Sequence, residues 1–74
     1  EDIASNIDLT DAINRFLRSL PIEQRRVFIM RYWYMSSISD IAISFGMSDS
    51  KVISILFRVR NKLKDHLTKE GFDL

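Results

Sequence analysis

One stretch, SISDIAISFGMSDSKVISILFRVRNKLK at residues 37–64, constrains the fold of this chain more than any other. Ser37 and Ser48 each precede a segment of helical apolar spacing, and a serine side chain at such a position caps the first turn of a helix. Gly46 lies between them and can adopt the left-handed conformation that ends a helix. The pattern predicts a short helix before Gly46 and a longer one after Ser48, which together form a helix-turn-helix.

The rest of the chain also reads as helical, because no alternating strand pattern or internal repeat occurs. Asp8 is expected to cap the first helix, after a lead-in or linker stub at residues 1–8, and Pro21 is expected to end it. Gly71 is expected to end the last helix. We therefore predict an all-α, four-helix single domain over residues 1–74. The expected helices cover about 9–19, 22–34, 38–45 and 49–68.

The last of these helices combines a buried stripe with basic flanks. Apolar residues recur at spacings of four, three and four at Val52, Leu56, Val59 and Leu63. The i+3 spacing from Val52 favours a core position for Ile55 as well. Lys and Arg residues remain for the other sides of the helix, and a small basic helix with a polar first turn is the shape that enters a DNA major groove.

The second helix contains the run VFIMRYWYM, whose apolar residues spread round most of its circumference. Such a helix is either central to a core or covered by a partner. The small size of the chain favours a core helix. The alternative is a partner groove shared with the first helix.

Composition sets further limits. The 74 residues carry a net charge of +1, with six Lys or Arg against four acids in residues 47–74 and five against six in residues 1–46. The basic excess thus lies on the second half of the motif. The absence of cysteine suits a cytoplasmic protein, and no segment approaches the roughly 18 apolar residues of a membrane span. Because the chain begins at Glu1, we expect it to be part of a longer protein.

Residues for catalysis or cofactor binding are scarce. His66 is the single histidine, and we expect it to be a surface or half-buried helix residue. Two glycines leave no material for a phosphate-cradling loop, and the serines have no histidine positioned to activate them. We predict a protein that is not an enzyme and that has no cofactor and no metal site.

Three phrases in order resemble region 4 of sigma-70-type RNA polymerase sigma factors, of the extracytoplasmic-function sort. They are LPIEQRRVFIMRYW, SISDIAISFGMSDSKV and LFRVRNKL, within Leu20 to Leu67. The resemblance implies a helix-turn-helix domain of the winged-helix-like DNA-binding superfamily. It implies recognition of the promoter −35 element in double-stranded DNA and docking on the β flap of the RNA polymerase core.

Carried over by position, the resemblance places DNA contacts at the starts of the two motif helices and along the second. These residues are Ser37, Ile38, Ser48, Asp49, Ser50, Lys51, Ile53, Ser54, Arg58 and Arg60. Lys51 and Arg58 suit phosphates, and Ser50 and Ser54 suit base edges. The apolar positions expected to dock on the flap are Phe16, Leu20, Val27, Phe28 and Tyr32.

Two positions depart from the family pattern. Ile43 and Ile53 stand where sigma factors commonly carry polar or basic residues. An exposed Ile53 can touch a thymine methyl group. If Ile43 and Ile53 are both exposed, they form a small apolar strip with Phe57, one turn beyond Ile53. Such a strip suits a protein partner, such as an anti-sigma regulator that masks the DNA face. Two alternatives stay open. One is an output domain of a two-component-type regulator, since such domains share the phrase I-A-x-x-x-G-x-S-x-x-x-V. The other, suggested by Ile43 and Ile53, is a helix-turn-helix module repurposed for protein–protein interaction.

Overall fold

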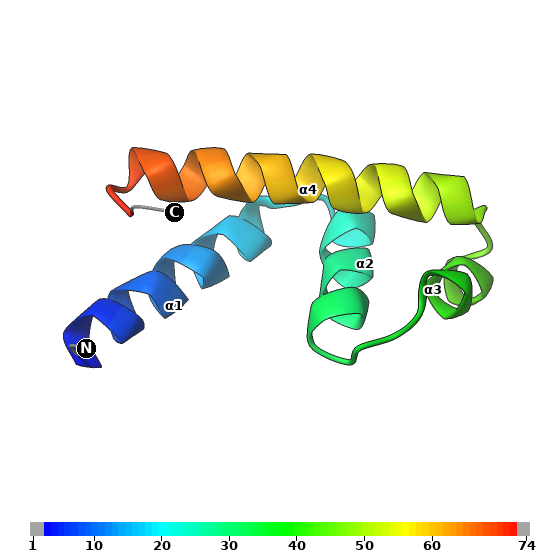
Figure 1. Ribbon diagram of the computed structural model, residues 1–74, viewed down its shortest axis with the longest axis horizontal. Helices are drawn as coiled ribbons and strands as arrows, with labels where there is room; N and C mark the ends of the chain where they lie inside the picture. Colours follow the sequence, from blue (N-terminus) through cyan, green and yellow to red (C-terminus); the bar gives the residue numbers. More distant parts are fainter. Residues whose placement is uncertain (1–2, 73–74) are drawn as a thin grey trace.

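The structure, a computed structural model, describes the backbone of residues 3–72 and the side chains from residue 8 onward. It contains α1 (Ile3–Ser19), α2 (Ile22–Tyr32), α3 (Ile38–Phe45) and α4 (Asp49–Lys69), and the described residues include no strand. The long α4 contacts each of the other three helices, which lie along one side of it (Figure 1). The all-α helix-turn-helix prediction is confirmed.

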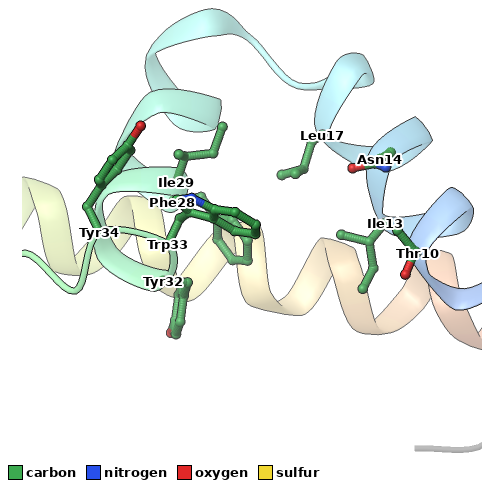
Figure 2. Close-up of a pocket in the computed structure, with 9 residues that line it drawn as sticks. All are labelled: Thr10, Ile13, Asn14, Leu17, Phe28, Ile29, Tyr32, Trp33 and Tyr34. Carbon is green, nitrogen blue, oxygen red and sulfur yellow. The ribbon is translucent and has the colours of Figure 1, made fainter. Parts of the chain in front are cut away.

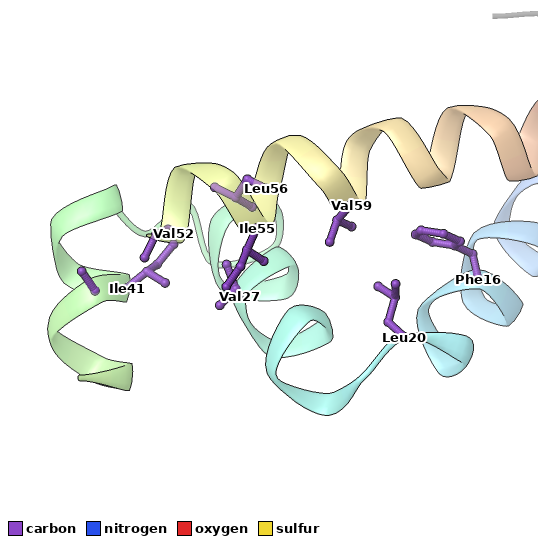
Figure 3. Close-up of a cluster of buried hydrophobic side chains, with 9 residues drawn as sticks. Phe16, Leu20, Val27, Ile41, Val52, Ile55, Leu56 and Val59 are labelled. Atoms are coloured by element: carbon purple, nitrogen blue, oxygen red, sulfur yellow. The ribbon is translucent and has the colours of Figure 1, made fainter. Parts of the chain in front are cut away.

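The core is formed around one stripe of α4. Nine buried side chains from all parts of the chain meet there, and Figure 3 labels eight of them. They are Phe16, Leu20, Val27, Ile41, Ala42, Val52, Ile55, Leu56 and Val59. Ile55 is 5% exposed, which confirms the core position that its spacing predicted. Burial of each large side chain of this kind contributes about 1.5–3 kcal/mol relative to leaving it exposed.

The ends of the motif helices follow the predicted capping chemistry. The Ser37 hydroxyl accepts the backbone N–H of Asp40 at 3.0 Å, and the Ser48 hydroxyl accepts that of Lys51 at 3.1 Å. Gly46 ends α3 with φ = 62°, a left-handed conformation that a residue without Cβ adopts at little cost. These local bonds fix the turn between α3 and α4 and confirm the predicted bounds of α3.

The start of α1 differs from the prediction. The helix begins at Ile3 instead of about residue 9, so Asp8 lies inside it and caps nothing, and residues 3–8 are not a lead-in. No proline or glycine occurs in this stretch, so an established helix extends through it at low cost. Residues 1–2 of the predicted lead-in lie outside the described residues. Further along, Phe16 and Leu20 are buried.

The end of α2 also differs. The helix stops at Tyr32, two residues before the predicted end, and Met35 adopts a left-handed conformation with φ = 57°. The Ser36 backbone N–H donates to the Met30 carbonyl at 3.0 Å, and Arg31 donates to the Ser36 carbonyl at 3.0 Å. These bonds turn the chain toward α3. They leave the end of the apolar run exposed, whereas Val27, Phe28 and Met30 of α2 belong to the core or pack against it.

The far end of α4 is held to α1 by polar contacts. Arg15 donates two hydrogen bonds to the Glu70 carboxylate, at 2.6 and 3.0 Å. His66 is half-buried, as expected, with Nε2 3.1 Å from the Ala12 carbonyl oxygen. Gly71, with φ = 92°, follows the end of the helix. The hydrogen bonds from Arg15 lower the pKa of Glu70, more than partial desolvation raises it.

Replacement of Met35 by glycine is expected to stabilise the fold. The left-handed conformation costs a residue with a Cβ about 1–2 kcal/mol, whereas glycine loses about 0.5–1 kcal/mol through its freer unfolded state. The Met35 side chain is 79% exposed, so little burial is lost. Met35→Gly should therefore raise the free energy of unfolding by about 0.5–1 kcal/mol in urea titrations followed by circular dichroism. Tyr34→Gly, at an exposed neighbour without positive φ, should lower it.

The Arg15–Glu70 contact predicts a pH effect. Because the pKa of Glu70 is lowered in the folded chain, its contribution is present above the ordinary glutamate pKa and is lost as pH falls through the lowered value. An NMR titration should find the Glu70 pKa below its ordinary value, and Arg15→Gln should return it toward that value. Lys69→Gln, a neighbouring charge without a contact to Glu70, is the control. An unchanged Glu70 pKa in Arg15→Gln would contradict the pairing.

Candidate nucleic-acid interface

The first two and a half turns of α4 present a continuous exposed face. With about 3.6 residues per turn, positions at i, i+3, i+4 and i+7 lie on one side of a helix. Starting from Ser50, this side is opposite the buried stripe that contains Val52 and Leu56. Every residue on it is exposed, as is Lys51 at its edge. We call the following set the α4 face: Ser50, Lys51, Ile53, Ser54, Phe57 and Arg58.

The chemistry of the α4 face changes across its width. Ser50 and Ser54 lie along the middle. Lys51 and Arg58, seven residues apart, lie along one edge. Lys51 Nζ is 4.0 Å from a Glu23 carboxylate oxygen, but both side chains are about half exposed, so this pair is weak. Arg58 has no hydrogen bond or ion pair with any described residue, and its guanidinium is available to an anion.

The serines that cap the helices contribute differently. Their hydroxyls are already used as acceptors for Asp40 and Lys51. Ser37 and Ser48 therefore fix the position of the helix starts, where backbone N–H groups and the helix dipole can favour an anion. The Ile38 side chain packs against the core, so only the backbone amide of this residue is left for the predicted DNA contact.

Two further predicted DNA contacts have partners within the chain. An Asp49 carboxylate oxygen accepts the Ser39 hydroxyl at 3.3 Å, which joins the starts of α3 and α4. A carboxylate in the first turn also suits the positive end of the helix dipole. Arg60 donates to the Tyr32 hydroxyl, so its side chain is directed toward α2. The structure thus gives both residues a role in holding helices together.

A second candidate site lies between α1 and α2. It is a largely apolar groove of about 490 Å³, and in Figure 2 Ile13 and Leu17 extend from α1 toward the aromatic side chains of α2. The rings of Phe28 and Tyr32 lie 4.7 Å apart at its α2 wall. The lining residues are Thr10, Ile13, Asn14, Leu17, Phe28, Ile29, Tyr32, Trp33 and Tyr34. This groove matches the alternative of a partner surface shared by the first two helices.

The groove corrects the predicted docking residues. Phe16, Leu20 and Val27 are between 0% and 6% exposed and belong to the core, so they are not available to a partner. Phe28 and Tyr32 line the groove. Trp33, which is 78% exposed, was not among the predicted docking residues, because an apolar residue in a helical run gives no sign of whether it is buried. The early end of α2 is what places it at the surface.

Other kinds of site are not found in the described part of the chain. No group of three or more His, Asp or Glu side chains among the described residues is arranged to hold a metal ion. None of the helices there has the length and apolar character to cross a membrane.

A comparison with protein families matches the chain to the family described as Sigma-70, region 4, over residues 10–63. The match covers well over half of the chain and includes both the α4 face and the residues that line the groove. No curated protein and no solved structure matched the chain. The chain therefore belongs to the sigma-70 region 4 family, whose members are DNA-binding domains of transcription initiation.

Proposed function

We propose that this domain recognises the −35 element of promoters as the C-terminal domain of a sigma factor, and that it docks on the β flap of RNA polymerase through the groove between α1 and α2. The observation that carries the proposal is the α4 face, whose residues are all exposed and which begins at a capped helix start. A B-DNA major groove is about 12 Å wide and admits one α-helix.

Each part of the α4 face has a role in this proposal. Lys51 and Arg58 neutralise phosphates on one strand and fix the register of the helix. Ser50 and Ser54, in the middle, make short hydrogen bonds to base edges, which carry the sequence information. The starts of α3 and α4 direct backbone N–H groups at phosphates. Asp49 and Arg60 act indirectly, because they hold α4 against α3 and α2.

The two cations should control the salt dependence of DNA binding. Each phosphate contact that is lost reduces the slope of log K against log salt by about 0.9. Lys51→Ala and Arg58→Ala should each weaken binding to all duplexes and flatten that slope by about this amount in fluorescence anisotropy titrations at several salt concentrations. Lys69→Ala removes the same charge about 27 Å further along α4 and should leave the slope nearly unchanged.

The two serines should affect sequence preference. Ser50→Ala and Ser54→Ala each remove one hydrogen-bonding group from the middle of the α4 face and no charge. Each variant should therefore change the difference in binding free energy between −35-like and scrambled duplexes by about 1 kcal/mol or more. The slope of log K against log salt should stay the same. If the unaltered chain binds −35-like and scrambled duplexes with equal affinity, the −35 assignment is refuted.

The flap proposal is supported by the shape and lining of the groove. A helical segment that lays an apolar face into such a groove is a common recognition mode. The groove lies between α1 and α2, whereas the α4 face is opposite the stripe of α4 that packs on those helices. The two surfaces therefore point in different directions, and DNA and polymerase can be bound together.

Trp33 should be the main anchor of the flap. A large aromatic side chain at the edge of an apolar groove is typical of an interface hot spot, and its truncation costs about 2 kcal/mol or more. Trp33→Ala should therefore weaken binding of a β-flap-tip peptide about thirtyfold in isothermal titration calorimetry, with DNA binding intact. Ile22→Ala, which changes an exposed apolar residue at the other end of α2 and outside the groove, is the control. Equal peptide binding by both variants would contradict the groove assignment.

A further inference from the structure

An apolar pair interrupts the polar chemistry of the α4 face. Ile53 is 53% exposed and Phe57 is 61% exposed, and they are neighbours at i and i+4 on the helix. Neither side chain belongs to the core cluster or packs against it. Ile53 also lies one turn from Ser50, on the side of the α4 face away from Lys51 and Arg58. The pair thus stands among the groups that the proposed function directs at DNA.

We propose that Ile53, supported by Phe57, contacts the 5-methyl group of thymine and makes the domain select thymine at one or two positions of its site. The inference rests on the proposed DNA-binding function. The base edges of the major groove present one apolar group, the thymine methyl, so an apolar side chain there distinguishes thymine from every other base. A β-branched side chain such as Ile53 is stiff at χ1 and loses little freedom in such a contact.

The position of the cations supports a base contact for Ile53. Lys51 and Arg58 follow one edge of the α4 face, and the apolar pair lies on the other side of Ser50 and Ser54. With Lys51 and Arg58 against one phosphate strand, the rest of the face turns into the groove toward the bases. An uncharged Ile53 gains nothing from a phosphate, and against a methyl group it buries apolar surface.

The size of the patch argues against a protein as the occupant. A specific protein interface buries about 1,200–2,000 Å² in total and has an apolar centre made of several residues. Two half-exposed side chains with serines and cations around them supply a small part of that area. The apolar groove of this domain lies elsewhere, between α1 and α2. A methyl group, by contrast, is matched in size to one isoleucine.

The test isolates the methyl group. The full 74-residue chain first selects duplexes from a pool with a randomised central segment. Each thymine of the selected duplex is then replaced by deoxyuridine, which removes the methyl group and keeps the base pair. At one or two positions this change should weaken binding about threefold to fivefold, the value of one buried methyl-sized group. Elsewhere it should have no effect.

Variants at Ile53 connect the effect to this residue. Ile53→Ala should bind the thymine and deoxyuridine duplexes with equal affinity. Ile53→Val should keep most of the difference in affinity between the two duplexes. Ile53→Lys should lose the difference while its overall affinity rises and its salt slope steepens by about 0.9. Ile43→Ala changes an isoleucine that is 80% exposed on α3 and should behave like the unaltered chain. Thermal unfolding of each variant checks that it is folded.

The outcomes separate this inference from the proposed function. If the chain selects duplexes but no deoxyuridine replacement changes the affinity, thymine selection by Ile53 is overturned and promoter binding stands. The same holds if Ile53→Ala keeps the full thymine preference. If no duplex is selected at all, both proposals fail. The thymine contact is supported if deoxyuridine lowers the affinity at particular positions, and if this loss of affinity is absent in Ile53→Ala and present in Ile53→Val.

Discussion

Burial of a single stripe of α4 is the constraint on which the rest of this structure depends. Val52 and Val59 are completely buried, and Leu56 between them is 2% exposed. The other three helices all pack on this side of α4. Because the helical repeat is fixed, burial of the stripe forces Ser50, Ser54 and their neighbours to the opposite side. The candidate DNA surface is therefore a direct consequence of core packing and needs no interaction of its own to form.

The same constraint explains the groove. α1 and α2 both pack on α4 but diverge from the corner at Pro21, so their outer parts do not close on each other (Figure 1). α2 ends at Tyr32, and no other helix in the described part of the chain covers Trp33 and Tyr34, which follow it. Trp33 and Tyr34 consequently remain exposed at the α2 wall of the groove.

The sequence predicted the parts of the fold that are determined locally. Capping serines and Gly46 act through bonds a few residues long, so α3 and the start of α4 were placed correctly. Asp8 was misread because a capping side chain matters only where a helix begins, and nothing in the preceding residues stops α1. The end of α2 depends on a left-handed Met35, a conformation that a methionine does not signal.

The candidate sites divide in the same way. Helical spacing separated Ile55 in the core from the exposed Ile53, because both belong to one regular helix. It did not separate core from docking surface in the first half of the chain. Phe16, Leu20 and Val27 were predicted as docking residues, yet they are buried, since apolar character alone does not say which neighbour covers a side chain. That distinction depends on the angle between α1 and α2, which is a tertiary property.

The arrangement of two surfaces also accounts for the low net charge of +1. With Lys51 and Arg58 as its main free cations, the α4 face can neutralise few phosphates, and each one contributes to affinity and to salt dependence. If the groove holds the domain at the polymerase as proposed, the domain meets promoter DNA at a high effective concentration, so weak contacts are sufficient. Under that condition selectivity matters more than charge. An isoleucine that reads a methyl group is then an advantage over a lysine, which would bind every sequence alike.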